Sequence, residues 1–307
     1  MRHCFYLLFL YSSFGLTQQV AQYSQWSFAP GIYNPAYSGI KKYPELKLFS
    51  RMQWLGIAQA PSSSLLLADF QIPAKRTEIY SARHGMSIRI ENDQLGPFTN
   101  NQLNFSYAFH KNVTQDNRFS MGLALGLKQF IFENSTLHPL IPDPSIAKNS
   151  TQYTPTFMLG SLWNTKSFYI GLSLDQITAA KWNNVGTSSN YSLSSFLTSG
   201  GKIMILPSVT LLPAICIMRS VNSSFTTNAN LFLDFSSKIK IGAGYRNKDA
   251  FIGFFQININ KAVSIGYSVD YVISELHNKA LFSHELTFSF KSFEEDEKLE
   301  KLSCPLF

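Results

Sequence analysis

Apolar and polar residues alternate along much of this chain. The clearest instance is the stretch 85–111, which begins with Met86, Ile88 and Ile90 separated by polar residues. Strand-breaking residues form a loop at 92–97, and the alternation then resumes. A period of two indicates a strand with one apolar and one polar face. Two such runs joined by a loop predict an antiparallel hairpin.

The strongest single strand is predicted at 119–128. Its odd-numbered positions hold large apolar residues from Phe119 to Leu127, whereas its even-numbered positions are small or polar and include Gly122, Ala124 and Gly126. Small residues on one face of a strand indicate that another part of the protein packs closely against it.

The same alternation recurs along the chain and predicts about fourteen strands, with no helical period and no alternation of strands with helices. Pro213 either weakens the ninth of these strands or marks a bulge in it. Many strands without helices predict a closed antiparallel barrel or a sandwich. The predicted strands span residues 46–55, 62–72, 86–91, 102–110, 119–128, 153–163, 168–175, 191–201, 208–219, 225–235, 239–245, 251–258, 262–272 and 282–291.

Composition favours a barrel in a membrane. Charged residues make up 15% of the chain and aromatic residues 14%, which suits a sheet with one apolar and one polar face. Outer-membrane barrels use even strand numbers and this alternation, and Trp54, Trp163 and Tyr271 lie near predicted strand ends, as aromatic girdles do. The expected fold is all-β, a transmembrane antiparallel β-barrel of the outer membrane in contact with outer-membrane lipid. The charge of +7 comes from scattered residues, so nucleic acid is not an expected partner.

Both ends of the chain differ from the barrel pattern. Residues 1–22 have the basic start and short apolar stretch of a secretory signal peptide. Residues 23–291 form the expected barrel with an N-terminal turn segment, and residues 292–307 form an acidic tail, expected to be solvated. If the N-terminus is periplasmic, the long loops after the fifth, seventh and thirteenth strands face outside, which matches the usual asymmetry. The connection at 73–81 is the exception, because it is long and falls on the inner side. The tail then lies in the periplasm too.

No set of residues points to catalysis. The six histidines lack metal-ligand spacing, and no glycine-rich phosphate loop precedes a helix. We therefore expect a protein that is not an enzyme and that uses no cofactor or metal. Arg89 and Glu91, on the polar face of a predicted strand, are candidate lumen charges. Ordinary paired polar positions are a simpler interpretation of them than a selectivity filter.

Several short motifs, taken in order, resemble the PorP/SprF family. They begin with Asn-Pro-Ala and a glycine at 34–39 and end with a Tyr-Ser-x-Asp-Tyr motif and a Ser-His-Glu motif in the last two strands. The resemblance covers about residues 25–290. The family-motif positions are Asn34, Pro35, Ala36, Gly39, Arg51, Gln53, Trp54, Asp93, Gly96, Pro97, Tyr267, Asp270 and Tyr271.

The resemblance implies a function and partners. Family members are outer-membrane components of the type IX secretion system of Bacteroidota, several of them tied to gliding motility or to export of particular surface proteins. It implies an accessory barrel that works with the secretion machinery and with secreted cargo. The alternative is an independent porin or ligand-uptake barrel.

The segment 34–39 has two interpretations. Pro35 fixes one backbone angle and Gly39 permits another, so the segment has a defined shape. We expect a structural turn that closes the periplasmic mouth of the barrel. A contact with a partner or cargo is the alternative.

Overall fold

The computed structural model describes most of the barrel. It covers residues 20–41, 43–72, 82–133, 149–177, 193–221 and 224–292. The expected signal peptide, apart from its last three residues, and the acidic tail beyond Ser292 lie outside the described residues.

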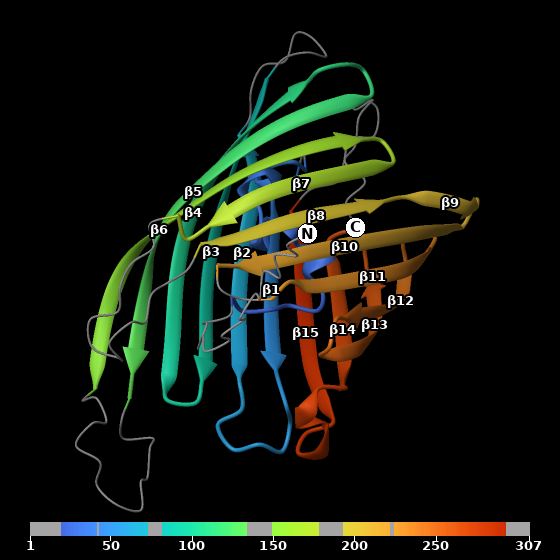
Figure 1. The fold of residues 1–307 in the computed structure, drawn as a ribbon. Coiled ribbons are helices and arrows are strands. Elements are labelled where there is room, and N and C mark those ends of the chain that lie inside the picture. Colours follow the sequence, from blue (N-terminus) through green and yellow to red (C-terminus); the bar gives the residue numbers. More distant parts are fainter. Residues whose placement is uncertain are drawn as a thin grey trace, which may run out of the picture.

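The strands form one closed antiparallel ring of fourteen (Figure 1). Neighbours in the chain pair with each other, β8 pairs with β10, and β15 closes the ring on β1. The strands are β1 (Glu45–Met52), β2 (Ser62–Ile72), β3 (Arg83–Leu95), β4 (Phe98–Asn112), β5 (Asn117–Phe132), β6 (Ser150–Thr165), β7 (Phe168–Asp175), β8 (Ser194–Gly201), β9 (Ile203–Leu206), β10 (Val209–Ser220), β11 (Thr226–Phe235), β12 (Ile239–Arg246), β13 (Ala250–Asn258), β14 (Val263–Val272) and β15 (Phe282–Lys291).

The predicted strands are present, with two differences. The expected loop at 92–97 is wrong, because β3 and β4 continue pairing as far as Leu95 and Phe98 and leave a tight turn around Gly96. The eighth predicted strand extends past Gly201 as a short separate strand, β9, after a break at Lys202. Pro213 lies opposite this break and has no N–H to donate, which accounts for the irregularity.

The two faces of each strand meet different surroundings. In β5, the odd-numbered side chains from Phe119 to Leu127 are 39–58% exposed on the outside, whereas Ser120 and Ala124 on the inside are 0–1% exposed. A long apolar row on the outside of a closed ring is the surface that lipid covers. Trp163 and Tyr271 are also exposed, and they lie near the ends of β6 and β14. Within the described part of the chain, no helix has the length and apolar character needed to cross a membrane.

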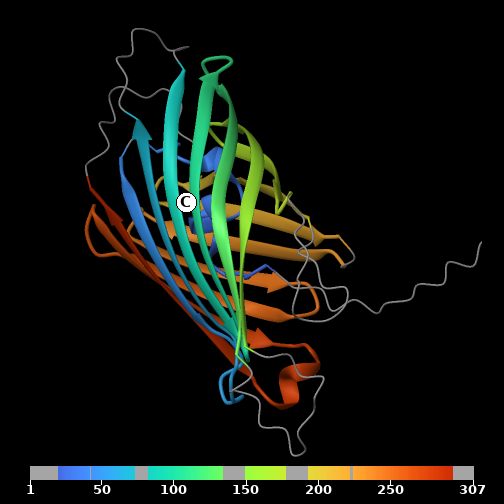
Figure 2. The ribbon, with the colours of Figure 1, turned by 90° about the vertical axis from the view of Figure 1, so that its left-hand side faces the viewer.

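The N-terminal segment lies inside the ring. It runs from Tyr23 to Ile40 through three 3-10 turns, η1 (Trp26–Phe28), η2 (Pro30–Ile32) and η3 (Pro35–Tyr37), before β1 begins. Figures 1 and 2 show it in dark blue, enclosed by strands from both halves of the chain. We call residues 23–40 the plug. The end of the barrel where β1 begins and β15 ends is called the terminal end, and the opposite end the far end.

The register of β5 can be tested with a pair of arginine substitutions. Leu125 is 55% exposed on the lipid side, so Leu125→Arg should destabilise the barrel in lipid by about 2–4 kcal/mol. Ala124→Arg should instead clash inside the lumen. Val113→Arg, in an exposed turn at the terminal end, is the control and should have little effect. Unfolding in lipid vesicles measures all three, and an unchanged stability for Leu125→Arg would contradict the register.

Candidate functional site: a plug inside the barrel

The plug is almost completely buried in the lumen. Every residue from Tyr23 to Ile40 except Gly31 is buried. Pro30 and Pro35 start two of its three turns, because the fixed backbone angle of proline suits the first position of a helical turn. Asn34 caps the third turn, and its side chain accepts a hydrogen bond from the Ala36 N–H at 2.9 Å.

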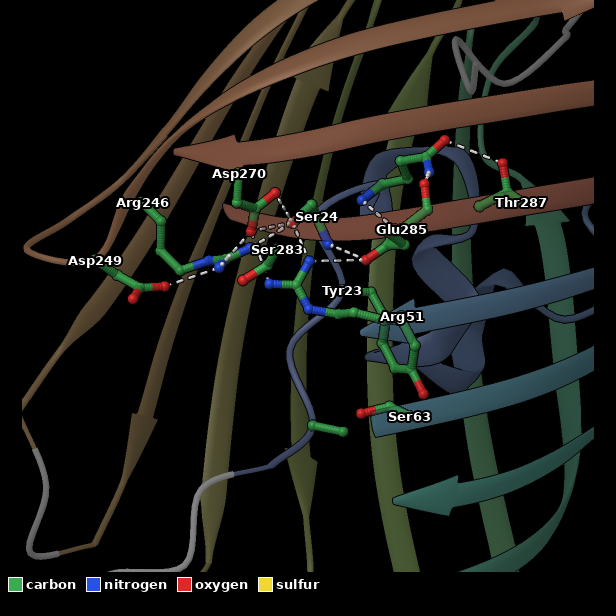
Figure 3. Close-up of polar contacts among 12 residues, drawn as sticks. Tyr23, Ser24, Arg51, Ser63, Arg246, Asp249, Asp270, Ser283, Glu285 and Thr287 are labelled. Atoms are coloured by element: carbon green, nitrogen blue, oxygen red, sulfur yellow. Dashed lines mark hydrogen bonds and ion pairs between the residues drawn. The ribbon is translucent and has the colours of Figure 1, made fainter. Parts of the chain in front are cut away.

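Ser24 lies at the centre of a buried charged cluster (Figure 3). Its hydroxyl donates to the Asp270 carboxylate at 2.8 Å and accepts from Arg51 at 2.6 Å and Arg246 at 2.7 Å. Its backbone N–H donates to Glu285 at 2.7 Å. Arg51 also pairs with Asp270 at 2.7 Å and with Glu285 at 3.2 Å, while Arg246 pairs with Asp270 at 3.1 Å. The plug therefore completes a network of two buried cations and two buried anions.

Gln25 extends this attachment by three hydrogen bonds. Its backbone N–H donates to the Glu285 carboxylate at 2.8 Å, and its side-chain amide donates to the Glu285 carbonyl at 3.2 Å. Thr287 donates to the amide oxygen of Gln25 at 3.0 Å. The absence of a side chain at Gly266 makes room, because a Cβ there would lie 2.4 Å from the same oxygen.

The two candidate lumen charges face inward and bind the plug. The Tyr23 hydroxyl donates to the Glu91 carboxylate at 3.0 Å, and the Arg89 guanidinium donates to the Ile32 carbonyl. Arg89 also lies 3.6 Å from Glu91 on its own strand. Burial raises the pKa of the Tyr23 phenol, and the neighbouring Glu91 raises it further, so the phenol stays protonated as a donor. These charges hold the plug rather than line an open passage.

Apolar contacts fasten the plug to the opposite wall. Tyr33 stacks on Phe196 of β8, with ring centroids 5.0 Å apart, and Phe28 packs against Phe232 of β11 at 4.8 Å. Trp26 is fully buried in the same cluster as Tyr33. Complete burial of each large side chain contributes about 1.5–3 kcal/mol. Together with the polar contacts, these rings connect the plug to strands all around the barrel.

The plug backbone rests on a band of small residues in the inner wall. Gly85, Ala108, Gly122 and Gly160 are successive register partners on β3 to β6. A Cβ on Gly122 would lie 2.4 Å from the Ala36 nitrogen, and one on Gly160 would lie 2.0 Å from the Asn34 side-chain oxygen. The close packing predicted from the small face of β5 is therefore present, and the plug is what packs there.

Gly39 is needed for the same close approach. It has φ of +62°, in the left-handed region that favours glycine, and a Cβ on it would lie 2.3 Å from the Gly85 Cα. Its N–H donates to Asp69, and the adjacent Ser38 carbonyl accepts from His110 at 2.8 Å. The predicted structural turn is present: residues 34–39 pack inside the lumen near the terminal end, against Gly85 and Gly122 close to the start of β3 and β5. Closure of the periplasmic mouth by this segment stays a prediction, because it depends on the orientation of the barrel. The sequence reveals its turns but not the wall against which they pack.

Arg51 and Asp270 are motif positions that the fold brings together with the plug. They lie far apart in the sequence and meet because β14, β15 and β1 are neighbours in the ring. Glu285 belongs to a recognised motif, but it was not among the candidate site residues. Arg246, Ser24 and Gln25 were also missed. Alternation along β12 places Arg246 on the inner face, whereas Ser24 and Gln25 lie in a turn and carry no comparable signal.

Other motif positions shape the far end instead. The Gln53 N–H donates to the Pro61 carbonyl at 2.9 Å, and the Trp54 N–H donates to the Ser283 hydroxyl at 3.0 Å. Trp54 has φ of +48° in this loop. These contacts connect the start of the loop between β1 and β2 to the end of that loop at Pro61 and to Ser283 of β15.

The remaining motif positions lie at the β3–β4 hairpin or on the lipid side. Asp93 accepts a hydrogen bond from Ser63 at 2.6 Å, Gly96 forms the turn with φ of +55°, and the Pro97 carbonyl accepts from the Glu133 N–H at 3.0 Å. Tyr267 and Tyr271 point outward and are 41% and 42% exposed. Among the described contacts, Gly96, Pro97, Tyr267 and Tyr271 have none with the plug, whereas the Asp93 carboxylate acts electrostatically on Tyr23.

Comparison with known proteins identifies the family. A sequence model described as type IX secretion system membrane protein PorP/SprF matches residues 15–290. The chain belongs to the PorP/SprF family. No curated protein matches this PorP/SprF chain.

Solved structures similar to the PorP/SprF barrel include three outer-membrane barrels at low sequence identity. The translocator domain of autotransporter NalP from Neisseria meningitidis is 8% identical, with 82% of this chain and 89% of that chain covered and a TM-score of 0.47. A TodX deltaS2S3 mutant monoaromatic hydrocarbon channel is 8% identical, with 86% and 94% covered and a TM-score of 0.48. The CymD monoaromatic hydrocarbon channel is 10% identical, with 87% and 93% covered and a TM-score of 0.48.

The small-residue band predicts a plug-displacing substitution. Gly85→Ala would place a Cβ 2.0 Å from the Ser38 carbonyl oxygen and 2.5 Å from the Gly39 Cα, both backbone atoms. We expect a loss of about 1–3 kcal/mol of stability from overpacking. We also expect a higher conductance than wild type in planar bilayers, because the plug shifts from the wall.

The control is Gly253→Ala in β13. Its Cβ would meet only Val269, at an ordinary contact distance of 3.6 Å, so both stability and conductance should match wild type. A Gly85→Ala barrel indistinguishable from the Gly253→Ala barrel in both measurements would contradict the seating of the plug on β3.

Proposed function

We propose that this PorP/SprF barrel is a non-enzymatic accessory component that supports export of particular surface proteins, with a role in gliding motility. It acts by binding secretion-machinery components and cargo, not by conducting them through its own lumen. The observation that carries this proposal is the plug, which crosses the lumen and is held by buried hydrogen bonds, ion pairs and aromatic contacts.

The alternative, an independent porin or ligand-uptake barrel, requires a route through the lumen. The plug occupies such a route, and the polar residues that would line it are engaged with plug atoms, as Arg89 is with Ile32 and Glu91 with Tyr23. Among the described residues, no group of three or more His, Cys, Asp or Glu side chains could hold a metal ion. The plug therefore favours a role exerted from the surfaces of the barrel.

Deletion of the gene tests the accessory role. An accessory barrel serves its own cargo while the general machinery remains intact. Deletion should therefore leave one or a few surface proteins trapped or degraded inside the cell. Surface proteomics and fractionation measure this, with complementation by the wild-type gene as control. Normal export of every secreted protein, or loss of all of them together, would contradict the accessory role.

We also propose that the terminal end of the barrel, where β1 begins and β15 leads into the acidic tail, faces the periplasm. The start of the plug lies toward the far end of the lumen, because Ser24 contacts Arg51 and Asp270 close to the ends of β1 and β14. Short turns at the terminal end, such as that between β6 and β7, support this orientation, because outer-membrane barrels keep short turns on the periplasmic side. A protease-sensitive tag between residues 139 and 150 should be cut on intact cells. A tag after Asn164 should be cut only once the outer membrane is permeabilised. The reverse pattern would invert the barrel.

A further inference from the structure

One strand projects from the ring without a second neighbour. β9 (Ile203–Leu206) continues the course of β8 after the break at Lys202 and pairs with the first residues of β10. β7 begins at Phe168, opposite Gly201, and the last bond on that side runs from the Lys202 N–H to the Ser167 carbonyl at 2.8 Å. Figure 1 shows β9 and the adjoining end of β10 at the right-hand side of the barrel.

The outer edge of β9 therefore has no strand beside it among the described residues. Residues along an antiparallel strand direct their N–H and C=O groups alternately to one neighbour and the other. About half of these groups on β9 thus face the open edge. An open edge is a template for an added strand, and natural barrels normally remove such edges by closure.

Both faces of β9 are also apolar. Ile203, Met204, Ile205 and Leu206 are 53%, 70%, 54% and 56% exposed. An ordinary barrel strand is apolar on its lipid side only, so β9 has an additional apolar face toward the mouth. No charged residue interrupts it, although charges are the usual protection of an edge strand. A hydrocarbon environment does not suit this edge, because unpaired backbone groups are costly in lipid.

The charges around β9 indicate what would cover it. Five exposed lysines lie in the turns or at the strand ends of the terminal end. In the described turns of this end, the exposed acidic residue is Asp116, and it pairs with Lys166. These lysines would attract a strand that is flanked by acidic residues. The exposed lysines are Lys111, Lys166, Lys202, Lys238 and Lys261.

We propose that β9 is a docking edge for an extended, acidic-flanked apolar strand of a partner protein, which adds to the barrel wall by β-augmentation. Backbone hydrogen bonds along the edge supply affinity, the two apolar faces contact alternate side chains of the added strand, and the lysines select its flanks. This inference rests on the proposed function, for which it supplies a physical site of partner binding at the terminal end.

The test uses the purified full-length barrel in nanodiscs and fluorescein-labelled peptides. The fluorescence anisotropy of the labelled peptide DEVTVIVDE should rise when it binds the barrel. The same peptide N-methylated at alternate residues keeps its side chains but loses edge donors, so it should bind about tenfold more weakly or worse. The peptide KKVTVIVKK should also bind more weakly because of its charge.

Three variants locate the site. Ile205→Pro should weaken DEVTVIVDE binding about tenfold, since proline removes a donor at the position where β9 and β10 lose register. Met204→Lys should weaken DEVTVIVDE binding similarly, because a charged side chain on an edge strand opposes the addition of another strand. Val113→Lys adds the same charge at another exposed apolar site of this end and should leave binding unchanged. Far-UV circular dichroism checks that each variant remains folded.

Several outcomes would overturn the proposal. Equal binding of the N-methylated peptide would mean hydrophobic adhesion instead of strand addition, and no binding of DEVTVIVDE would remove the site. A dimer by light scattering that Ile205→Pro abolishes would make a second copy the occupant. Tighter peptide binding after truncation at Ser292 would make the chain's own tail the occupant. Peptide binding is measured on the purified barrel, whereas the accessory role is tested by export in cells. A failure of the β9 proposal is therefore distinguishable from a failure of the proposed function.

Discussion

The ion-pair cluster around Ser24 is the interaction on which the arrangement of the plug and the barrel seam depends. Arg51 is 1% exposed and lies between two carboxylates that are buried equally deeply. Buried charges are costly to leave unpaired, so removal of one member would leave its partners uncompensated. Charge-assisted hydrogen bonds to Ser24 complete the network. The lumen is therefore stable with the plug in place, and its own charges favour that state.

The same cluster links the plug to the closure of the ring. Arg51 and Glu285 are direct register partners on β1 and β15, the two strands whose pairing closes the barrel. Ser24 approaches this seam from the lumen, only a short distance in sequence before β1. Docking of the plug and pairing of the first and last strands therefore satisfy the same buried groups, which makes the two events mutually supportive.

Along β3 to β6, the inner wall accommodates the plug backbone instead of side chains. Gly85, Ala108, Gly122 and Gly160 remove the side-chain layer over four strands, and Gly39 allows the plug to turn there. The plug is thus held by charge on one side and by close steric fit on the other. With the lumen filled in this way, the surfaces left for the proposed partners are the loops and the β9 edge at the ends of the barrel.

The alternation of residues by itself determined the strand positions, their lipid and lumen faces and the barrel class, because side chains along a strand point alternately to opposite sides whatever their partners. It also placed Arg89 and Glu91 inside and revealed that something packs on β5. The destination of residues 23–40 was decided only by the tertiary structure. A segment of short, irregularly spaced turns has no period that records its surroundings, and its contacts come from strands up to about 260 positions away. The meeting of Arg51 with Asp270, and the isolation of β9 at the wall, likewise follow from ring closure and strand length, which no local pattern contains.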